Sequence, residues 1–119
     1  MTADDYAQAI AQEARAAVEA GGHRRALGYL SDQARQRVRQ AGLEYQRTDD
    51  VQGFEVRHPT DLVTEVEDEL ADAMAWAVAL KLRMKAAGHD IKIGAFLVTL
   101  GELQQDMAGW WTDARDVAA

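Results

Sequence analysis

Residues 60–87 form the longest stretch of the chain without glycine or proline, and this stretch most restricts the possible folds. Pro59 precedes it and Gly88 follows it, which is the usual order at the two ends of a helix. Thr60 is the expected N-cap. Apolar residues recur at helical spacing along one side: Leu62, Val66, Leu70, Ala73, Ala77, Leu80 and Met84. The stretch therefore predicts one long helix whose apolar side needs a cover.

Three further helices are predicted, at about residues 3–20, 24–41 and 90–112. The first is rich in alanine, has Thr2 as a candidate N-cap and ends at Gly21-Gly22. The second would end before Gly42, and the third would begin at Asp90 as its N-cap. The apolar side of the last helix comprises Ile93, Phe96, Leu97, Leu100, Leu103, Met107 and either Trp110 or Trp111.

Residues 43–59 lack helical periodicity and are interpreted as a connector, with a short extended piece around Phe54–Val56. Four helices and no strand hairpin predict an all-α, four-helix bundle-like single domain over residues 1–119. Such a chain buries a modest core, and the alanine-rich helix over residues 3–20 and the long helix over residues 60–87 would gain from a partner subunit. A homodimer is therefore expected.

Charge and composition exclude several classes of protein. The chain has 13 basic and 20 acidic residues, so its net charge of −7 argues against direct DNA binding. It has no cysteine, which excludes a disulfide scaffold and a thiol nucleophile. It has no apolar run long enough to span a membrane, and its acidic first residues do not resemble a signal peptide. A cytoplasmic protein without membrane contact is expected.

The predicted long helix carries an acidic stripe, which we define as Asp61, Glu65, Asp68 and Asp72. Their spacing is i, i+4, i+7 and i+11, so they share one side of a helix, and Glu69 lies beside them. Like charges at this spacing repel each other. Arginines of residues 24–47 or a bound Mg²⁺ could offset that repulsion, because Mg²⁺ prefers carboxylate oxygens. Glu65, Glu69 and Asp72 are therefore candidate magnesium ligands, and the alternative is a solvated acidic face.

The segment Glu69-Leu70-Ala71-Asp72, after Glu65-Val66-Glu67-Asp68, resembles the Glu-x-x-Asp helix of MazG-like nucleotide pyrophosphohydrolases. Gly88–Lys92 also resembles the turn that follows this helix in the family. The resemblance covers about residues 61–92. It implies an all-α enzyme that uses Mg²⁺ to hydrolyse nucleoside triphosphates, with Glu69 and Asp72 as a magnesium-binding pair and Glu65 as an additional ligand.

This sequence departs from the family pattern at the first acidic pair, a Glu-x-x-Glu that the family has on an earlier helix. The matching region here, residues 33–40, is rich in arginine. Glu44 is the carboxylate near that place on a possible helix, and Asp49 and Asp50 lie in the loop that follows. In the enzyme interpretation, positive side chains would neutralise charge on the reacting phosphates. The candidates for this role are Arg35, Arg39, Lys81 and Lys85.

The alternative is a non-enzymatic interaction module, such as a phage or bacterial regulator that binds a protein partner through its acidic face. Its candidate surface comprises Asp61, Glu65, Asp68, Trp110 and Trp111. The two tryptophans are adjacent, so both cannot face the same core from one helix. One of them is expected to meet a partner, a neighbouring helix or a ligand. A third alternative is a purely structural subunit that assembles through these tryptophans.

Overall fold

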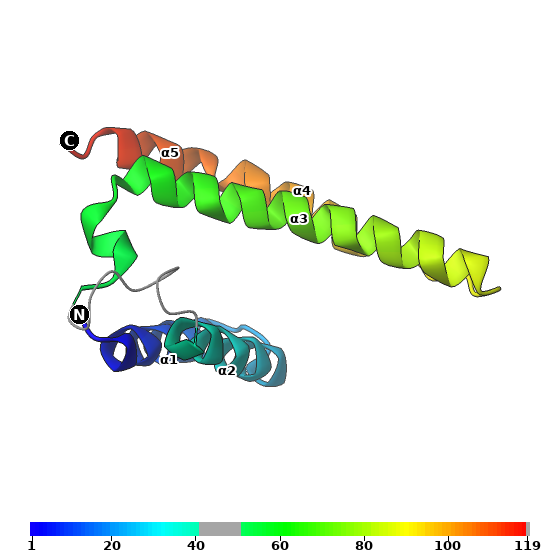
Figure 1. The fold of residues 1–119 in the computed structure, drawn as a ribbon, viewed down its shortest axis with the longest axis horizontal. Coiled ribbons are helices and arrows are strands. Elements are labelled where there is room, and N and C mark those ends of the chain that lie inside the picture. The colour runs from blue at the N-terminus through cyan, green and yellow to red at the C-terminus, as the bar shows by residue number, and fades with distance from the viewer. Residues whose placement is uncertain (41–50, 119) are drawn as a thin grey trace. The chain divides into compact units, whose positions relative to one another are not determined.

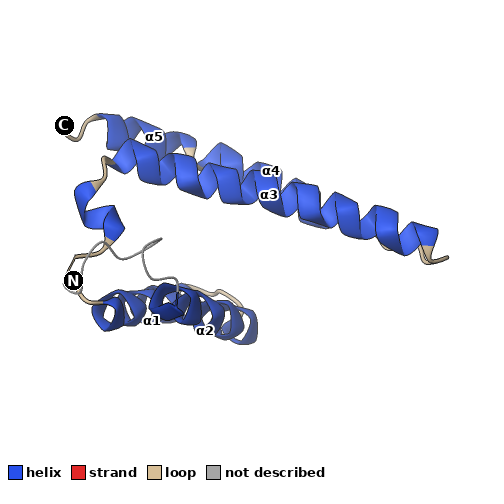
Figure 2. Ribbon diagram, in the orientation of Figure 1, coloured by secondary structure: helices blue, strands red, loops and turns tan. Residues whose placement is uncertain are grey.

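The computed structural model describes residues 1–40 and 51–118 and confirms the all-α fold class. Within these ranges it contains five α-helices, one short 3₁₀ helix and no strand (Figure 1, Figure 2). The chain divides into two compact units, unit 1 (Met1–Val56) and unit 2 (Arg57–Ala119). Residues 43–50 of the predicted connector and residue 41 of the predicted second helix lie outside the described residues. The single four-helix domain stays a prediction.

Unit 1 is a helical hairpin of α1 (Ala3–Glu19) and α2 (Arg24–Gln40). Thr2 caps α1 as predicted, because its hydroxyl accepts from the Asp5 N–H at 3.1 Å while the Asp5 carboxylate accepts from the Thr2 N–H. These hydrogen bonds favour the charged carboxylate and hold the pKa of Asp5 below its ordinary value. The small side chain of Ala7 is fully buried.

Two glycines make the turn between α1 and α2. Gly21 has a φ of +106°, a left-handed conformation that glycine adopts without a Cβ clash. A Cβ on Gly22 would lie 2.8 Å from the Ala17 carbonyl oxygen and 2.5 Å from Leu27 Cδ1. The helices therefore approach closely at this turn because position 22 has no side chain.

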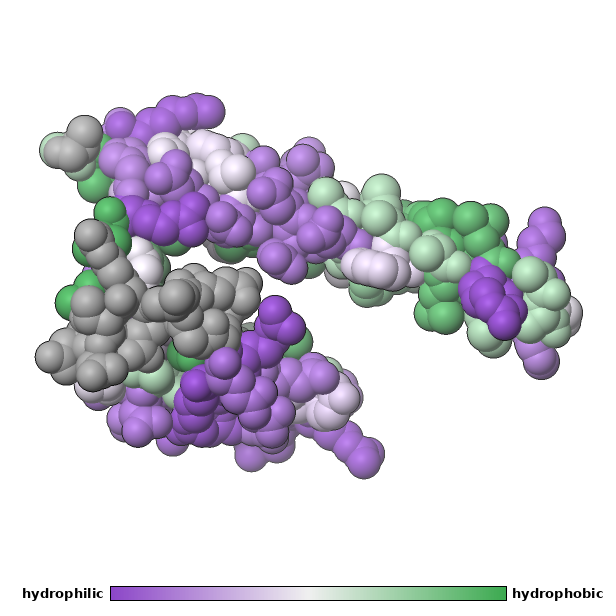
Figure 3. All heavy atoms as spheres, in the orientation of Figure 1, coloured by the Kyte–Doolittle hydropathy of each residue, from purple (hydrophilic) through white to green (hydrophobic). Residues whose placement is uncertain are grey.

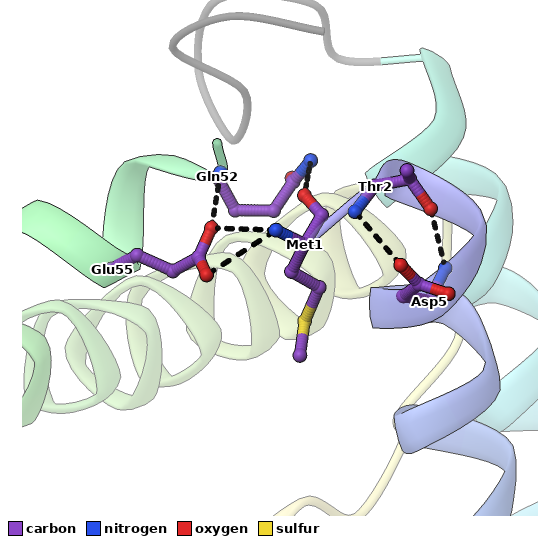
Figure 4. A network of polar contacts seen from close by, with 5 residues as sticks. All are labelled: Met1, Thr2, Asp5, Gln52 and Glu55. Carbon is purple, nitrogen blue, oxygen red and sulfur yellow. Dashed lines mark hydrogen bonds and ion pairs between the residues drawn. The ribbon is translucent and has the colours of Figure 1, made fainter. Parts of the chain in front are cut away.

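The residues around Phe54 form a 3₁₀ helix, η2 (Gly53–Val56), so the predicted extended piece at Phe54–Val56 is wrong. The Glu55 carboxylate is the cause, since it accepts from the Gln52 N–H at 2.8 Å and from the Met1 ammonium at 3.3 Å (Figure 4). These contacts curl the segment towards α1 and hold the pKa of Glu55 below its ordinary value, with the Gln52 hydrogen bond as the main cause.

Unit 2 consists of α3 (Pro59–Ala86), α4 (Gly94–Asp106) and α5 (Ala108–Arg115). The long helix is confirmed, but Thr60 is not its N-cap. His58 holds that position, and its Nδ1 accepts from the Thr60 N–H at 3.2 Å. The other ring nitrogen, Nε2, lies 2.9 Å from the carbonyl oxygen of Val117 and so fixes the start of α3 to the chain beyond α5.

The predicted helix 90–112 is wrong in two respects. It begins at Gly94, and Asp90 does not cap it, because the Asp90 carboxylate accepts instead from Lys81 Nζ at 3.4 Å. It is also interrupted at Met107, whose N–H is shared between the carbonyls of Leu103 and Gln104. This tightened turn separates α4 from α5, and α5 extends beyond residue 112 to Arg115.

The inner side of α3 differs in part from the predicted apolar side. Val63 is buried against Met107 and Ala114, with Leu70 and Trp111 packed on this cluster. Val66 and Leu80, which were expected inside, are exposed. The residues that take their place are Val63, Glu67 and Lys81, whose spacing matches that of Leu70, Ala77 and Met84. The inner side thus follows a heptad pattern in which two positions are charged.

Candidate functional site

Every member of the acidic stripe is exposed on α3, and so is Glu69. Glu65 accepts a hydrogen bond from Arg57 Nη2 at 3.0 Å. The side chains of Asp61, Asp68, Glu69 and Asp72 form no hydrogen bond or ion pair with the described part of the chain. Across residues 1–40 and 51–118, no group of three or more His, Cys, Asp or Glu side chains is arranged to hold a metal. The magnesium site of Glu65, Glu69 and Asp72 therefore stays a prediction.

The four basic candidates for phosphate binding belong to different units. In unit 1, Arg35 pairs with Asp32, and Arg39 Nε lies 3.2 Å from the Asp4 carboxylate. In unit 2, Lys81 donates to the Ile91 carbonyl at 2.6 Å and also contacts Asp90, and Lys85 is exposed in the last turn of α3. Three of the four thus bind a carboxylate or a backbone carbonyl of their own unit. Their presence therefore does not require a bound phosphate.

Arg35 also lines a groove of about 580 Å³ between α1 and α2. Arg15 and Arg24 contribute to its wall, together with the carboxylates of Glu19 and Asp32. The Nε of Arg35 is buried without a hydrogen-bond partner. The groove is therefore of mixed charge, and the residues that line it do not select for an anion over a cation.

Glu67 is the one acidic residue of α3 that packs inward, and sequence analysis assigned it no role. Its carboxylate accepts a hydrogen bond from the indole Nε1 of Trp111. The guanidinium of Arg115 lies 5.3 Å from the centre of the same ring. The heptad spacing from Val63 and Leu70 is the signal that would have placed Glu67 on the inner side.

Trp110 and Trp111 diverge, as their adjacency predicted. Trp111 packs on the core of unit 2, whereas Trp110 is 55% exposed. Trp110 lines an open apolar groove of about 420 Å³ together with Leu62 and Val66 of α3. Of the two tryptophans, Trp110 is therefore the one available to a partner.

Unit 2 exposes large apolar side chains along its whole length. Figure 3 shows hydrophobic residues gathered over the C-terminal part of α3, beyond a hydrophilic N-terminal part. A further groove of about 740 Å³ lies between that end of α3 and the start of α4, where Lys81 and Lys92 border it. The exposed set comprises Val66, Met74, Trp76, Val78, Leu80, Leu82, Phe96, Val98, Leu103, Trp110 and Val117.

The described helices include none that is long and apolar enough to cross a membrane. The chain was compared with family models, curated proteins and solved structures. No family model, no curated protein and no solved structure matches it.

Proposed function

We propose that this protein is a helical interaction module that binds the basic surface of a protein partner through its acidic stripe. The observation that carries the proposal is the exposure of Asp61, Glu65 and Asp68 on one side of α3, where only Glu65 has a basic partner in the described structure. Complementary charge accelerates association and selects partners. Repulsion within the stripe weakens the isolated helix, so a basic partner relieves it.

The test is a pull-down with the full chain that carries Asp61→Lys, Glu65→Lys and Asp68→Lys. A matched control reverses three exposed acids elsewhere, Glu13→Lys, Glu102→Lys and Asp106→Lys, and has the same net charge. We expect the wild type and the control to retain one protein in similar amounts. The amount of that protein retained by the stripe variant should be at least tenfold lower. If no retained protein distinguishes the stripe variant from the control, the proposal is wrong.

A second candidate function is Mg²⁺-dependent hydrolysis of nucleoside triphosphates, as the MazG-like resemblance implies. The observation that favours it is the exposed pair Glu69 and Asp72, whose side chains are three residues apart and form no hydrogen bond or ion pair with the described part of the chain. These two carboxylates could hold Mg²⁺, with Glu65 as a third ligand once it leaves Arg57. A bound ion would supply charge neutralisation at the phosphates.

Calorimetric titration of Mg²⁺ with a nucleoside triphosphate present separates the two candidates. The enzyme candidate requires saturable binding that is lost in the double variant Glu69→Gln with Asp72→Asn. The interaction module requires no such binding. Identical Mg²⁺ binding curves for the wild type and the double variant, after the heat of Mg²⁺ binding to the nucleotide alone is subtracted, exclude the enzyme candidate and leave the pull-down as the deciding experiment.

A further inference from the structure

We propose that a second copy of the chain covers one apolar face of unit 2, with the two α3 helices packed antiparallel. The inference does not depend on the acidic stripe, whose residues lie roughly a quarter turn away around α3. We define the apolar face as Val66, Ala73, Trp76 and Leu80 of α3 with Phe96, Leu103 and Trp110 of α4 and α5.

The α3 part of the apolar face follows the spacing of helices that pack along their length. Val66, Ala73 and Leu80 are seven residues apart, and Trp76 lies between the last two at the alternate core position. This is the same pattern that the inner side of α3 uses against α4 and α5, displaced around the helix. Helix α3 therefore has two seams, and α4 and α5 pack on the inner one.

Helices α4 and α5 contribute a second row. Phe96 and Leu103 are seven residues apart and so share one side of α4, and the exposed Trp110 follows on α5. The groove that Trp110 shares with Leu62 and Val66 places this row on the same side of unit 2 as the α3 row. The row on α3 and the row on α4 and α5 together make one apolar surface.

Such a surface is unusual on a protein that remains a monomer. Trp76 is 75% exposed and Leu80 is 54% exposed. Residues 73–80 contain no polar side chain, and a helix that is apolar all round is normally buried. In the described part of α1 and α2, the exposed large apolar side chains are only Tyr29 and Leu30. A second copy, in contrast, offers an apolar face of the same length.

Charge fixes the direction of the pairing. Glu69 lies on this α3 seam before the apolar segment, three residues after Val66. Arg83 lies on the same seam after that segment, three residues after Leu80. Antiparallel helices set Glu69 of each copy near Arg83 of the partner subunit, whereas parallel helices would set like charges together. A two-fold axis across the middle of α3 forms both Glu69–Arg83 pairs at once.

Side-chain size fixes the register. A two-fold axis between Ala73 and Trp76 packs the small Ala73 of each copy against the large Trp76 of the other. The same axis brings Glu69 within about one helical turn, ~5 Å along the helix, of Arg83 of the partner subunit. An arginine side chain spans that offset, so two equivalent Glu69–Arg83 pairs flank the tryptophans.

Sedimentation equilibrium of the full chain tests the proposal. We expect the wild type to have twice the 13.1 kDa mass of one chain, and Trp76→Asp to have the single mass with unchanged helical circular dichroism. Trp76 is largely exposed in the single chain, so its substitution leaves the monomer folded. The matched control is Leu82→Asp, which is 63% exposed and lies outside the apolar face, and which we expect to remain a dimer.

Charge reversal tests the antiparallel register. Glu69→Arg alone and Arg83→Glu alone each raise the dimer dissociation constant tenfold or more, because each leaves like charges facing each other. An equimolar mixture of these two variants restores the dimer, since every pair in the mixed dimer is then complementary. A monomeric wild type, a dimer that Trp76→Asp does not dissociate, or a mixture no tighter than its components would overturn the proposal.

The proposal on the acidic stripe can fail independently. The variant with Asp61, Glu65 and Asp68 reversed keeps the apolar face and both members of the Glu69–Arg83 pair. We therefore expect it to dimerise while it loses the protein partner. A monomeric stripe variant would instead mean that the stripe belongs to the interface between copies, and the antiparallel register would be wrong.

Discussion

Units 1 and 2 are both built from antiparallel helices, but they differ in how far their large apolar side chains are buried and their acids are paired. In unit 1 the large exposed apolar residues are few, and Asp4, Asp32 and Glu55 each have a cationic partner. In unit 2 most large apolar residues of α3 and α4 are exposed, and most acids of α3 have no basic partner in the described structure. The comparison shows that unit 1 pairs several of its acids internally and exposes few large apolar side chains, whereas unit 2 exposes both kinds of group, as the proposed association requires.

The largest expected effect is on the small core of unit 2. Met107 is 2% exposed and packs with Val63 of α3 and Ala114 of α5, so Met107→Ala leaves a cavity and lowers the free energy of unfolding by about 2–5 kcal/mol. All three tryptophans lie in unit 2, so their fluorescence during denaturation reports this unit alone. The control Leu82→Ala is exposed and should change stability by no more than about 0.5 kcal/mol. Equal effects of the two changes would contradict the assigned core.

A smaller effect is expected at the turn of unit 1. Gly22→Ala places a Cβ against the Ala17 carbonyl oxygen, which cannot move without distorting α1, so we expect a loss of about 1–3 kcal/mol. Gly28 lies within α2 with open space around it, and Gly28→Ala should stabilise by about 0.5–1 kcal/mol. Thermal unfolding followed by circular dichroism measures both variants. The same sign for both would show that the close approach at Gly22 is absent.

The smallest expected effect is a pH dependence of the stability of unit 1. The pKa of Asp5 and that of Glu55 are lowered in the folded chain. The contribution of these two carboxylates to the free energy of unfolding is therefore complete above about pH 5. It is lost as the pH falls through the lowered values, below about pH 4. Glu55→Gln removes part of this dependence, and the wild type and the variant should converge in thermal midpoint at acidic pH. A difference that grows with acidity would reverse the assigned sign.

Local signals predicted the long helices, and tertiary contacts decided the rest. Thr2 and Gly21 mark the ends of α1, and Pro59 and Gly88 mark those of α3, so these bounds could be taken from the sequence. The N-cap of α3 was wrong because the imidazole of His58 competes with Thr60, and its other nitrogen contacts Val117, which is far away in sequence. The interruption at Met107 has no proline to mark it, and the nearest glycine, Gly109, lies within α5.

The prediction of the inner side of α3 was partly wrong because two heptad patterns overlap on the helix. Leu62, Val66, Ala73 and Leu80 form one apolar row, and Val63, Leu70, Ala77 and Met84 form the other. A single apolar stripe mixes members of both rows. Only the hydrogen bond of Glu67 to Trp111 and the contacts of Lys81 near Ile91 show that charged side chains stand on the inner row.

The candidate site was predictable in its exposure and not in its chemistry. Helical spacing alone places Asp61, Asp68 and Asp72 on one exposed side, and the structure agrees. The pairing of Glu65 with Arg57 depends on where α3 begins, and the divergence of Trp110 from Trp111 depends on how α5 packs. Whether the stripe binds a protein or Mg²⁺ is a property of a partner that the sequence does not contain.

The most direct test of the central claim, that a second copy covers the apolar face, is the distance between spin labels on the two copies. The chain has no cysteine, so Ala75→Cys and Thr64→Cys each accept one label per chain at an exposed position of α3. Antiparallel pairing about Ala73 and Trp76 predicts labels that almost coincide along the axis at position 75 and lie about 30 Å apart along it at position 64. Equal short distances at both positions would show parallel pairing, and no dipolar coupling between chains would show that no second copy binds; either result would contradict the account.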